Sequence, residues 1–153
     1  MLNIKHILHP TDFSDNSNQA LKYACSLATQ FSAELHLIHV SRNPALLAPP
    51  VNDYLPPDYY DRLMRQVSEQ LATLPEEVLN FSGSVTRNIC AGVAFVEIIR
   101  YARDNAIDMI VMGTHGYSGL KHLIIGSVAE NVVRKAPCPV LTVHPDNYEF
   151  VMP

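Results

Sequence analysis

Cysteine, tryptophan and glycine are scarce in this sequence of 153 residues. It contains three cysteines, six glycines and no tryptophan. No two cysteines form a Cys-x-x-Cys pair, and an odd count fits reduced thiols better than a disulfide framework. We therefore expect Cys25, Cys90 and Cys138 to be packing residues.

Positive charge and long apolar runs are also lacking. Lys and Arg number 11 against 15 Asp and Glu, which gives a net charge of −4. Duplex DNA and anionic membranes are bound chiefly through dense positive charge, so neither is expected as the main partner. No run approaches the roughly 18 apolar residues of a transmembrane helix. Residues 1–10 also lack the apolar core of a secretory signal, so we expect a cytoplasmic protein.

Apolar residues nevertheless make up 48% of the chain, which is enough for a sizeable core. The length is that of one ordinary domain. We expect a single domain over residues 1–145, followed by a tail at 146–153.

The order of the secondary structure elements follows from apolar runs and helical stripes. Short apolar runs predict strands at 3–9, 35–40, 84–90, 108–113 and 140–144. Apolar residues at helical spacing predict helices at 14–33, 58–74, 93–106 and 127–136. Residues 41–57 hold five of the eleven prolines, which predicts a long loop. This alternation is typical of an α/β fold with an open, doubly wound, parallel five-stranded sheet and helices on both faces.

In such sheets, ligands bind outside the carboxyl ends of the strands, at the switch point beside the first strand. Two segments with suitable chemistry follow predicted strands: residues 10–12, Pro-Thr-Asp, and residues 113–116, Gly-Thr-His-Gly. If the first and fourth strands are neighbours, both segments border one cleft.

The segment 113–127 has the composition of a phosphate-binding loop. Four glycines lie at 113, 116, 119 and 126, and Ser127 directly precedes a predicted helix. Glycine lets backbone N–H groups approach an oxyanion, and a helix amino terminus adds unpaired donors. The segment is neither a Walker loop nor the dinucleotide fingerprint. An ordinary glycine-rich connection is the alternative interpretation on composition alone.

The spacing of this segment resembles a known nucleotide-binding signature. In this segment, Gly113 is followed by two residues and Gly116, and then by nine residues and Gly126-Ser127. This pattern resembles the motif of the universal stress protein family, in its ATP-binding subgroup. Residues 7–14 are similar to the family's opening strand and acidic turn, and residues 137–141 to its closing strand. The resemblance therefore covers nearly the whole chain and implies a Rossmann-like fold of the adenine nucleotide alpha hydrolase type.

The resemblance also implies a ligand and a set of binding residues. The ligand is ATP with Mg²⁺, and the protein is a stress-response regulator whose nucleotide modulates association with a protein partner. Gly116, Gly126 and Ser127 would surround the phosphates and ribose, Asp12 would lie close to them, and the backbone of Val40 would meet the adenine. The full candidate set is Pro10, Thr11, Asp12, Val40, Met112, Gly113, His115, Gly116, Gly126, Ser127 and Val128.

The sequence favours binding over turnover. No Ser-His-Asp, Cys-His or paired-carboxylate spacing stands out, so we expect no catalytic residues and slow ATP hydrolysis at most. A nucleotide-independent interaction or chaperone-like protein with an unused site is the main alternative. An FMN redox carrier is suggested only by analogy of fold.

Seven histidines raise the question of a metal site. His6 and His9 are three apart on a predicted strand, as are His36 and His39, so the members of each pair point to opposite faces and cannot share one ion. His115 lies within the glycine-rich segment, where it would meet a phosphate or brace the turn.

The last predicted strand suggests how two copies would associate. In the switch-point topology it lies at an edge of the sheet, and its residues Val140, Leu141 and Val143 are apolar. Natural edges are usually protected by charge, which is absent between Lys135 and Asp146. We therefore expect a homodimer joined through this strand.

Overall fold

The computed structural model describes residues 2–41, 58–75, 81–115 and 125–145. The predicted tail and nearly all of the proline-rich loop lie outside these ranges, as does Gly116. Within them, no helix is long and apolar enough to span a bilayer.

Five strands form one parallel sheet in the order β3-β2-β1-β4-β5. The strands are β1 (His6–Pro10), β2 (Glu34–Ser41), β3 (Val85–Ala91), β4 (Met109–Gly113) and β5 (Val140–Val143). The helices between them are α1 (Asp15–Phe31), α3 (Tyr59–Thr73), α5 (Ala94–Asp104) and α6 (Ser127–Lys135). The α/β fold with its open, doubly wound sheet is confirmed.

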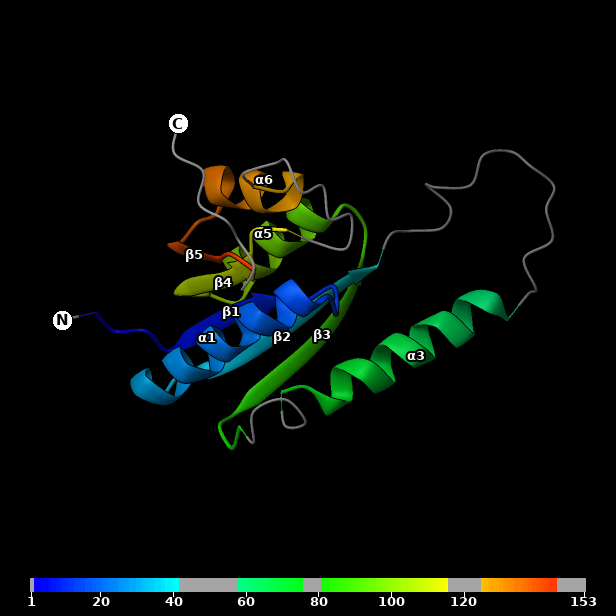
Figure 1. Cartoon of the computed structure of the whole chain (residues 1–153), viewed down its shortest axis with the longest axis horizontal. Coiled ribbons are helices and arrows are strands. Elements are labelled where there is room, and N and C mark those ends of the chain that lie inside the picture. Colours follow the sequence, from blue (N-terminus) through cyan, green and yellow to red (C-terminus); the bar gives the residue numbers. More distant parts are fainter. Residues whose placement is uncertain (1, 42–57, 76–80, 116–124, 146–153) are drawn as a thin grey trace.

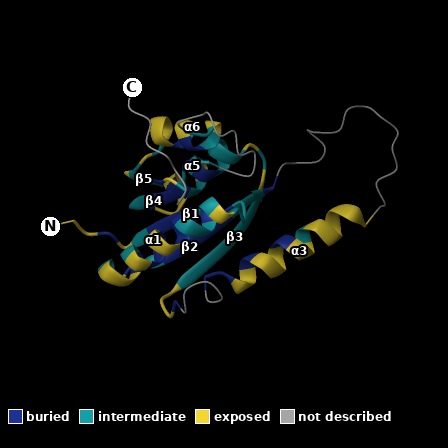
Figure 2. Ribbon diagram, in the orientation of Figure 1, coloured by how far each residue is buried: buried dark blue, intermediate teal, exposed yellow. Residues whose placement is uncertain are grey.

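The core has two layers, one on each face of the sheet (Figure 1). Helices α1 and α3 pack on one face against apolar side chains such as Ile7, Leu35 and Val111. Helices α5 and α6 pack on the other face against Leu8 and its neighbours on β2 and β4. Strand residues alternate between the two layers, as the side-chain period of two requires. The outward side of α3 is largely exposed (Figure 2).

Strand β1 begins later than the sequence predicts. The prediction placed its start at residue 3, whereas the strand runs from His6 to Pro10. The backbone N–H groups of Lys5 and His6 instead donate to the Asp108 carboxylate, at 2.7 and 3.0 Å. A side chain from the start of β4 therefore holds the entry to β1, which no local pattern in the sequence could reveal.

Helix α1 begins at a side-chain cap. The Ser14 hydroxyl accepts a hydrogen bond from the backbone N–H of Ser17, at 3.2 Å. This contact satisfies one of the donors left open in the first helical turn. It fixes the start of α1 directly after the carboxyl end of β1.

Candidate functional site

The carboxyl ends of β1 and β4 lie side by side. The two strands pair in parallel, with Ile7 opposite Met109 and Leu8 opposite Ile110. The predicted condition for a shared cleft is therefore met, since the segment at residues 10–12 and the segment at residues 113–115 follow neighbouring strands. The His9 ring adds a cross-link, because its Nδ1 lies 2.9 Å from the Val111 carbonyl oxygen.

The turn after β1 is held by its own polar side chains. The Asp12 Oδ1 atom accepts from both the backbone N–H and the hydroxyl of Ser14, at 3.0 and 2.6 Å. The Thr11 Oγ1 atom accepts from the Phe13 N–H and from the Ser17 hydroxyl, each at 3.0 Å. These contacts bend the chain sharply at Phe13, whose φ is 63°. Asp12 is therefore fixed at the end of β1 and adjacent to the start of α1.

Asn16 ties the start of α1 to the end of β4. Its Nδ2 donates to the His115 carbonyl oxygen at 2.7 Å. A Cβ on Gly113 would lie 2.6 Å from that same Nδ2, so the close approach of α1 requires glycine there. The other amide atom of Asn16, Oδ1, is buried without a hydrogen-bond partner among the described residues.

The start of α6 returns to the same edge. The Gly126 N–H donates to the Thr114 carbonyl oxygen at 2.6 Å. A Cβ on Gly126 would lie 2.9 Å from that oxygen, which is closer than real Cβ atoms approach backbone. Glycine at 126 therefore lets the chain come back against the end of β4.

Helix α6 has no side-chain cap at its amino end among the described residues, since its N-cap residue is Gly126. Among the described residues, no side chain takes the role that Ser14 has in α1, which is also true of α3 and α5. An uncapped helix start with its positive dipole end is suited to binding an anion. Ser127 and Val128 are the first two residues of this turn.

The other predicted residues occupy different positions. Val40 lies near the carboxyl end of β2, opposite Cys90 of β3. Met112 is 5% exposed, and its side chain packs in the core. The His115 ring Nδ1 lies 2.9 Å from the Thr114 hydroxyl, which fits the interpretation that His115 braces the turn. Gly116, a central member of the motif, lies outside the described residues.

Sequence reasoning missed several residues that build this edge. Asn16 was not singled out from the sequence, because its partner is 99 positions away in the chain. The Phe13 and His39 rings stack at 4.8 Å between centroids, at the ends of β1 and β2. Ser14 was predicted from the sequence as a possible cap of α1, with Asp15 as the alternative, and the structure shows Ser14 in that position.

Comparison with known proteins identifies the relatives of this chain. The family model described as the universal stress protein family matches residues 3–144. The universal stress protein MJ0577 of Methanocaldococcus jannaschii is 30% identical, over 94% of this chain and 96% of that protein. A solved structure of MJ0577 has a TM-score of 0.82 and 31% identity, and the match covers 96% of this chain and 100% of that chain.

Two further solved structures share the fold at lower identity. A universal stress protein in complex with cAMP has a TM-score of 0.70 and 21% identity, over 94% of this chain and 99% of that one. The universal stress protein of Archaeoglobus fulgidus in complex with dAMP has a TM-score of 0.59 and 17% identity, over 93% of this chain and 98% of that one.

Proposed function

The chain belongs to the universal stress protein family, and on that premise we propose that it is a regulatory protein that binds ATP with Mg²⁺ at the carboxyl edge between β1 and β4. Solved relatives carry the adenine nucleotides cAMP and dAMP. The proposal extends this ligand class to a nucleoside triphosphate and to this chain.

The placement of the α6 start against the end of β4 is the observation that carries the proposal. Gly126 holds this helix start against the Thr114 carbonyl oxygen, and Asn16 holds His115 from the other side. The sequence between these anchors contains Gly116 and Gly119. A phosphate chain bound here would receive N–H donors from the first turn of α6, including those of Ser127 and Val128.

The residues of β1 and β2 suit the other parts of the ligand. Asp12 carries a carboxylate oriented by Ser14, and a carboxylate beside phosphate oxygens is the usual protein contribution to a Mg²⁺ site. Pro10 ends β1 and Thr11 directly follows it, and Val40 is the second-to-last residue of the neighbouring strand β2. When bound, Mg²⁺ would neutralise phosphate charge. We propose binding with slow hydrolysis at most, and a change in protein association as its consequence.

Isothermal titration with ATP, ADP, AMP and FMN, each with and without Mg²⁺, tests this function. We expect binding of the adenine nucleotides, tightest for ATP with Mg²⁺, and no binding of FMN. Gly126→Ala should weaken ATP binding by at least about tenfold, since the added Cβ pushes the start of α6 away from Thr114. Val133→Ala is the matched control, because Val133 is an exposed residue of the same helix.

The absence of heat with every adenine nucleotide would contradict the proposal and favour the nucleotide-independent interaction protein. ATP binding that survives in Gly126→Ala at full strength would place the phosphate site elsewhere.

We also propose that two copies associate through β5. This strand is an edge of the described sheet, and its Leu141 side chain is 39% exposed. Val143 is only 8% exposed and packs in the core of its own chain, so its side chain does not supply the contact. A cytoplasmic location and a protein partner remain predictions from the sequence.

A further inference from the structure

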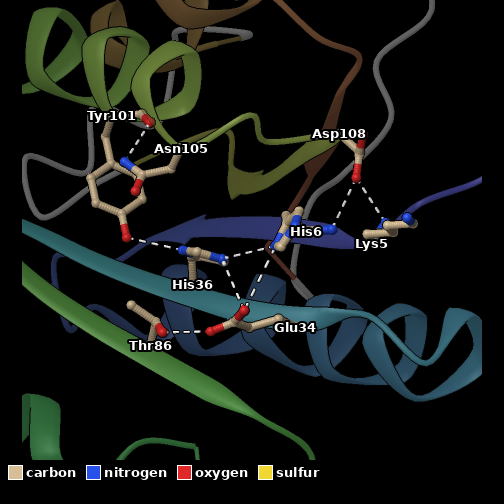
Figure 3. A network of polar contacts seen from close by, with 8 residues as sticks. All are labelled: Lys5, His6, Glu34, His36, Thr86, Tyr101, Asn105 and Asp108. Carbon is tan, nitrogen blue, oxygen red and sulfur yellow. Dashed lines mark hydrogen bonds and ion pairs between the residues drawn. The ribbon is translucent and has the colours of Figure 1, made fainter.

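We propose that His6, Glu34 and His36 form a binding site for a divalent transition ion such as Zn²⁺, at the amino-terminal end of the sheet. Nothing in the proposed nucleotide function uses these three residues. Figure 3 shows their polar atoms directed toward one another from the starts of β1 and β2.

Strand pairing brings the three residues together. His6 is the register partner of Glu34, so the two side chains project from the same face of the sheet. His36 follows Glu34 by two positions on β2 and therefore shares that face. His6 and His9 lie on opposite faces of β1, as predicted from the sequence. The proposed ligands come from two different strands, so spacing within one strand does not reveal them.

The ligand atoms are spaced as a metal ion requires. The His6 Nδ1 and His36 Nε2 atoms are 3.3 Å apart, and Glu34 Oε2 lies 3.7 Å from the first and 3.8 Å from the second. A triangle with these sides has its equidistant point about 2.1 Å from each corner. Zn–N and Zn–O bonds in proteins measure about 2.0–2.2 Å.

The contacts within the cluster are long. The His6 Nδ1 and His36 Nε2 atoms share a hydrogen bond at 3.3 Å, and Glu34 Oε2 lies at ion-pair distance from both, at 3.7 and 3.8 Å. Most nitrogen donors in proteins lie closer to their acceptors, at about 2.7–3.2 Å. Two imidazole nitrogens and a carboxylate oxygen thus surround one point, and only long contacts join them. Imidazole ligands favour Zn²⁺ and its neighbours over Mg²⁺ or Ca²⁺, which prefer oxygen.

Neighbouring side chains orient the ligands. The other ring nitrogen of His36, Nδ1, lies 3.0 Å from the Tyr101 hydroxyl on α5. The Thr86 hydroxyl of β3 donates to Glu34 Oε1 and leaves Oε2 directed at the histidines (Figure 3). The backbone at His6 is held by Asp108. Such outer partners are typical of metal sites, because they fix the tautomer and the orientation of each ligand.

The cluster is accessible from solvent on one side. The His6 and Glu34 side chains are 36% and 32% exposed, whereas that of His36 is 8% exposed. His6 and Glu34 line a surface pocket together with Lys5. Three protein ligands leave a further coordination position for water or an external ligand. The site lies at the opposite end of the strands from the nucleotide edge, about 13 Å away along β1 from His6 to Pro10.

Isothermal titration with ZnCl₂ tests the site, using full-length protein dialysed against chelator and free of nucleotide. We expect one Zn²⁺ per chain. His6→Gln and Glu34→Gln should each weaken binding by more than about a hundredfold, because each removes a ligand. Tyr101→Phe should weaken it by about tenfold, the size of effect seen when an outer partner is lost.

Matched controls separate this site from other histidines and acids. His39→Gln removes a histidine whose Nδ1 faces the Thr11 carbonyl oxygen, outside the cluster. Glu69→Gln removes an exposed carboxylate of α3. Both should bind Zn²⁺ as the wild type does. The proposal would be overturned if the wild type does not bind Zn²⁺. It would also be overturned if His6→Gln and Glu34→Gln bind Zn²⁺ as the wild type does, or if the controls lose as much affinity.

Thermal unfolding and ATP titration show whether each variant is intact. His6 and Glu34 are both partly exposed, so their substitution should preserve the fold. ATP affinity in the presence of Mg²⁺ should be the same for His6→Gln and the wild type. The two proposals fail separately, because Zn²⁺ binding is measured without nucleotide and ATP binding without Zn²⁺.

Discussion

Histidine side chains in this molecule differ in chemistry because they differ in burial. His9 is fully buried between the Val111 carbonyl oxygen and the Ser17 hydroxyl, and burial lowers its pKa from 6.5 to about 4. Burial also lowers the pKa of His36. His6 lies at the surface end of the same sheet and is partly exposed. The neutral His9 ring serves as a structural link between β1, β4 and α1.

The lowered pKa of His9 predicts that the protein becomes less stable as the pH falls. Between pH 6.5 and pH 4 the unfolded chain binds a proton at His9 that the folded chain does not, so the free energy of unfolding decreases as pH falls. Above pH 6.5 both states are neutral and the effect vanishes. Once the pH is below 4, the decrease in the free energy of unfolding due to His9 is about 3 kcal/mol. Urea unfolding from pH 7.5 to 4.5 should therefore show a shallower pH dependence in His9→Gln than in the wild type.

His39→Gln serves as the control for this experiment, because it removes a histidine that is only half-buried. Identical pH dependence in His9→Gln and the wild type would show that His9 does not carry the effect.

At the level of elements, the sequence predicted the order and type of all nine described helices and strands. Proline, glycine and the change from apolar runs to helical stripes mark most boundaries within a few residues. The predicted start of β1 was wrong, because the backbone before this strand bonds to the Asp108 carboxylate, which lies over a hundred positions away in the chain.

The two ends of the sheet were not equally predictable. The proposed nucleotide edge rests on contiguous motifs, at residues 10–12 and 113–127, so it could be predicted from local sequence. The cluster of His6, Glu34 and His36 depends on the register of β1 against β2. Register is set by packing of the whole sheet and is not written in either strand alone.

The contact between α1 and the end of β4 predicts a role for Asn16 in nucleotide binding. Asn16→Ala removes the hydrogen bond to the His115 carbonyl oxygen and releases one anchor of the glycine-rich loop. One such bond is worth about 0.5–1.5 kcal/mol, so the ATP dissociation constant should rise by about twofold to tenfold. Titration of ATP with Mg²⁺ measures the change.

Ser26→Ala is the control for Asn16, since Ser26 is an exposed residue of the same helix whose hydroxyl bonds within it. It should bind ATP as the wild type does. Equal affinity in Asn16→Ala and Ser26→Ala would mean that the α1 anchor does not position the loop for its ligand.

For the whole molecule, the two edges of the sheet are unequal. Strand β3 carries Arg87, whose guanidinium donates to the Leu71 and Leu74 carbonyl oxygens at the end of α3. Strand β5 pairs with β4, and no other described strand pairs with its far side. Its side chains are uncharged. An uncharged edge can accept a second strand, and a twofold axis would allow two copies of β5 to pair antiparallel.

This edge predicts a dimer that a single substitution dissociates. Leu141→Lys places a charge on the exposed side chain of β5. It should give a folded monomer in light scattering at micromolar concentration, where we expect the wild type to be a dimer. Val143 is unsuitable for this test because it is buried in its own core. Val133→Lys, on an exposed position of α6, should remain dimeric. A monomeric wild type would refute the dimer, and a dimer that persists in Leu141→Lys would place the interface away from β5.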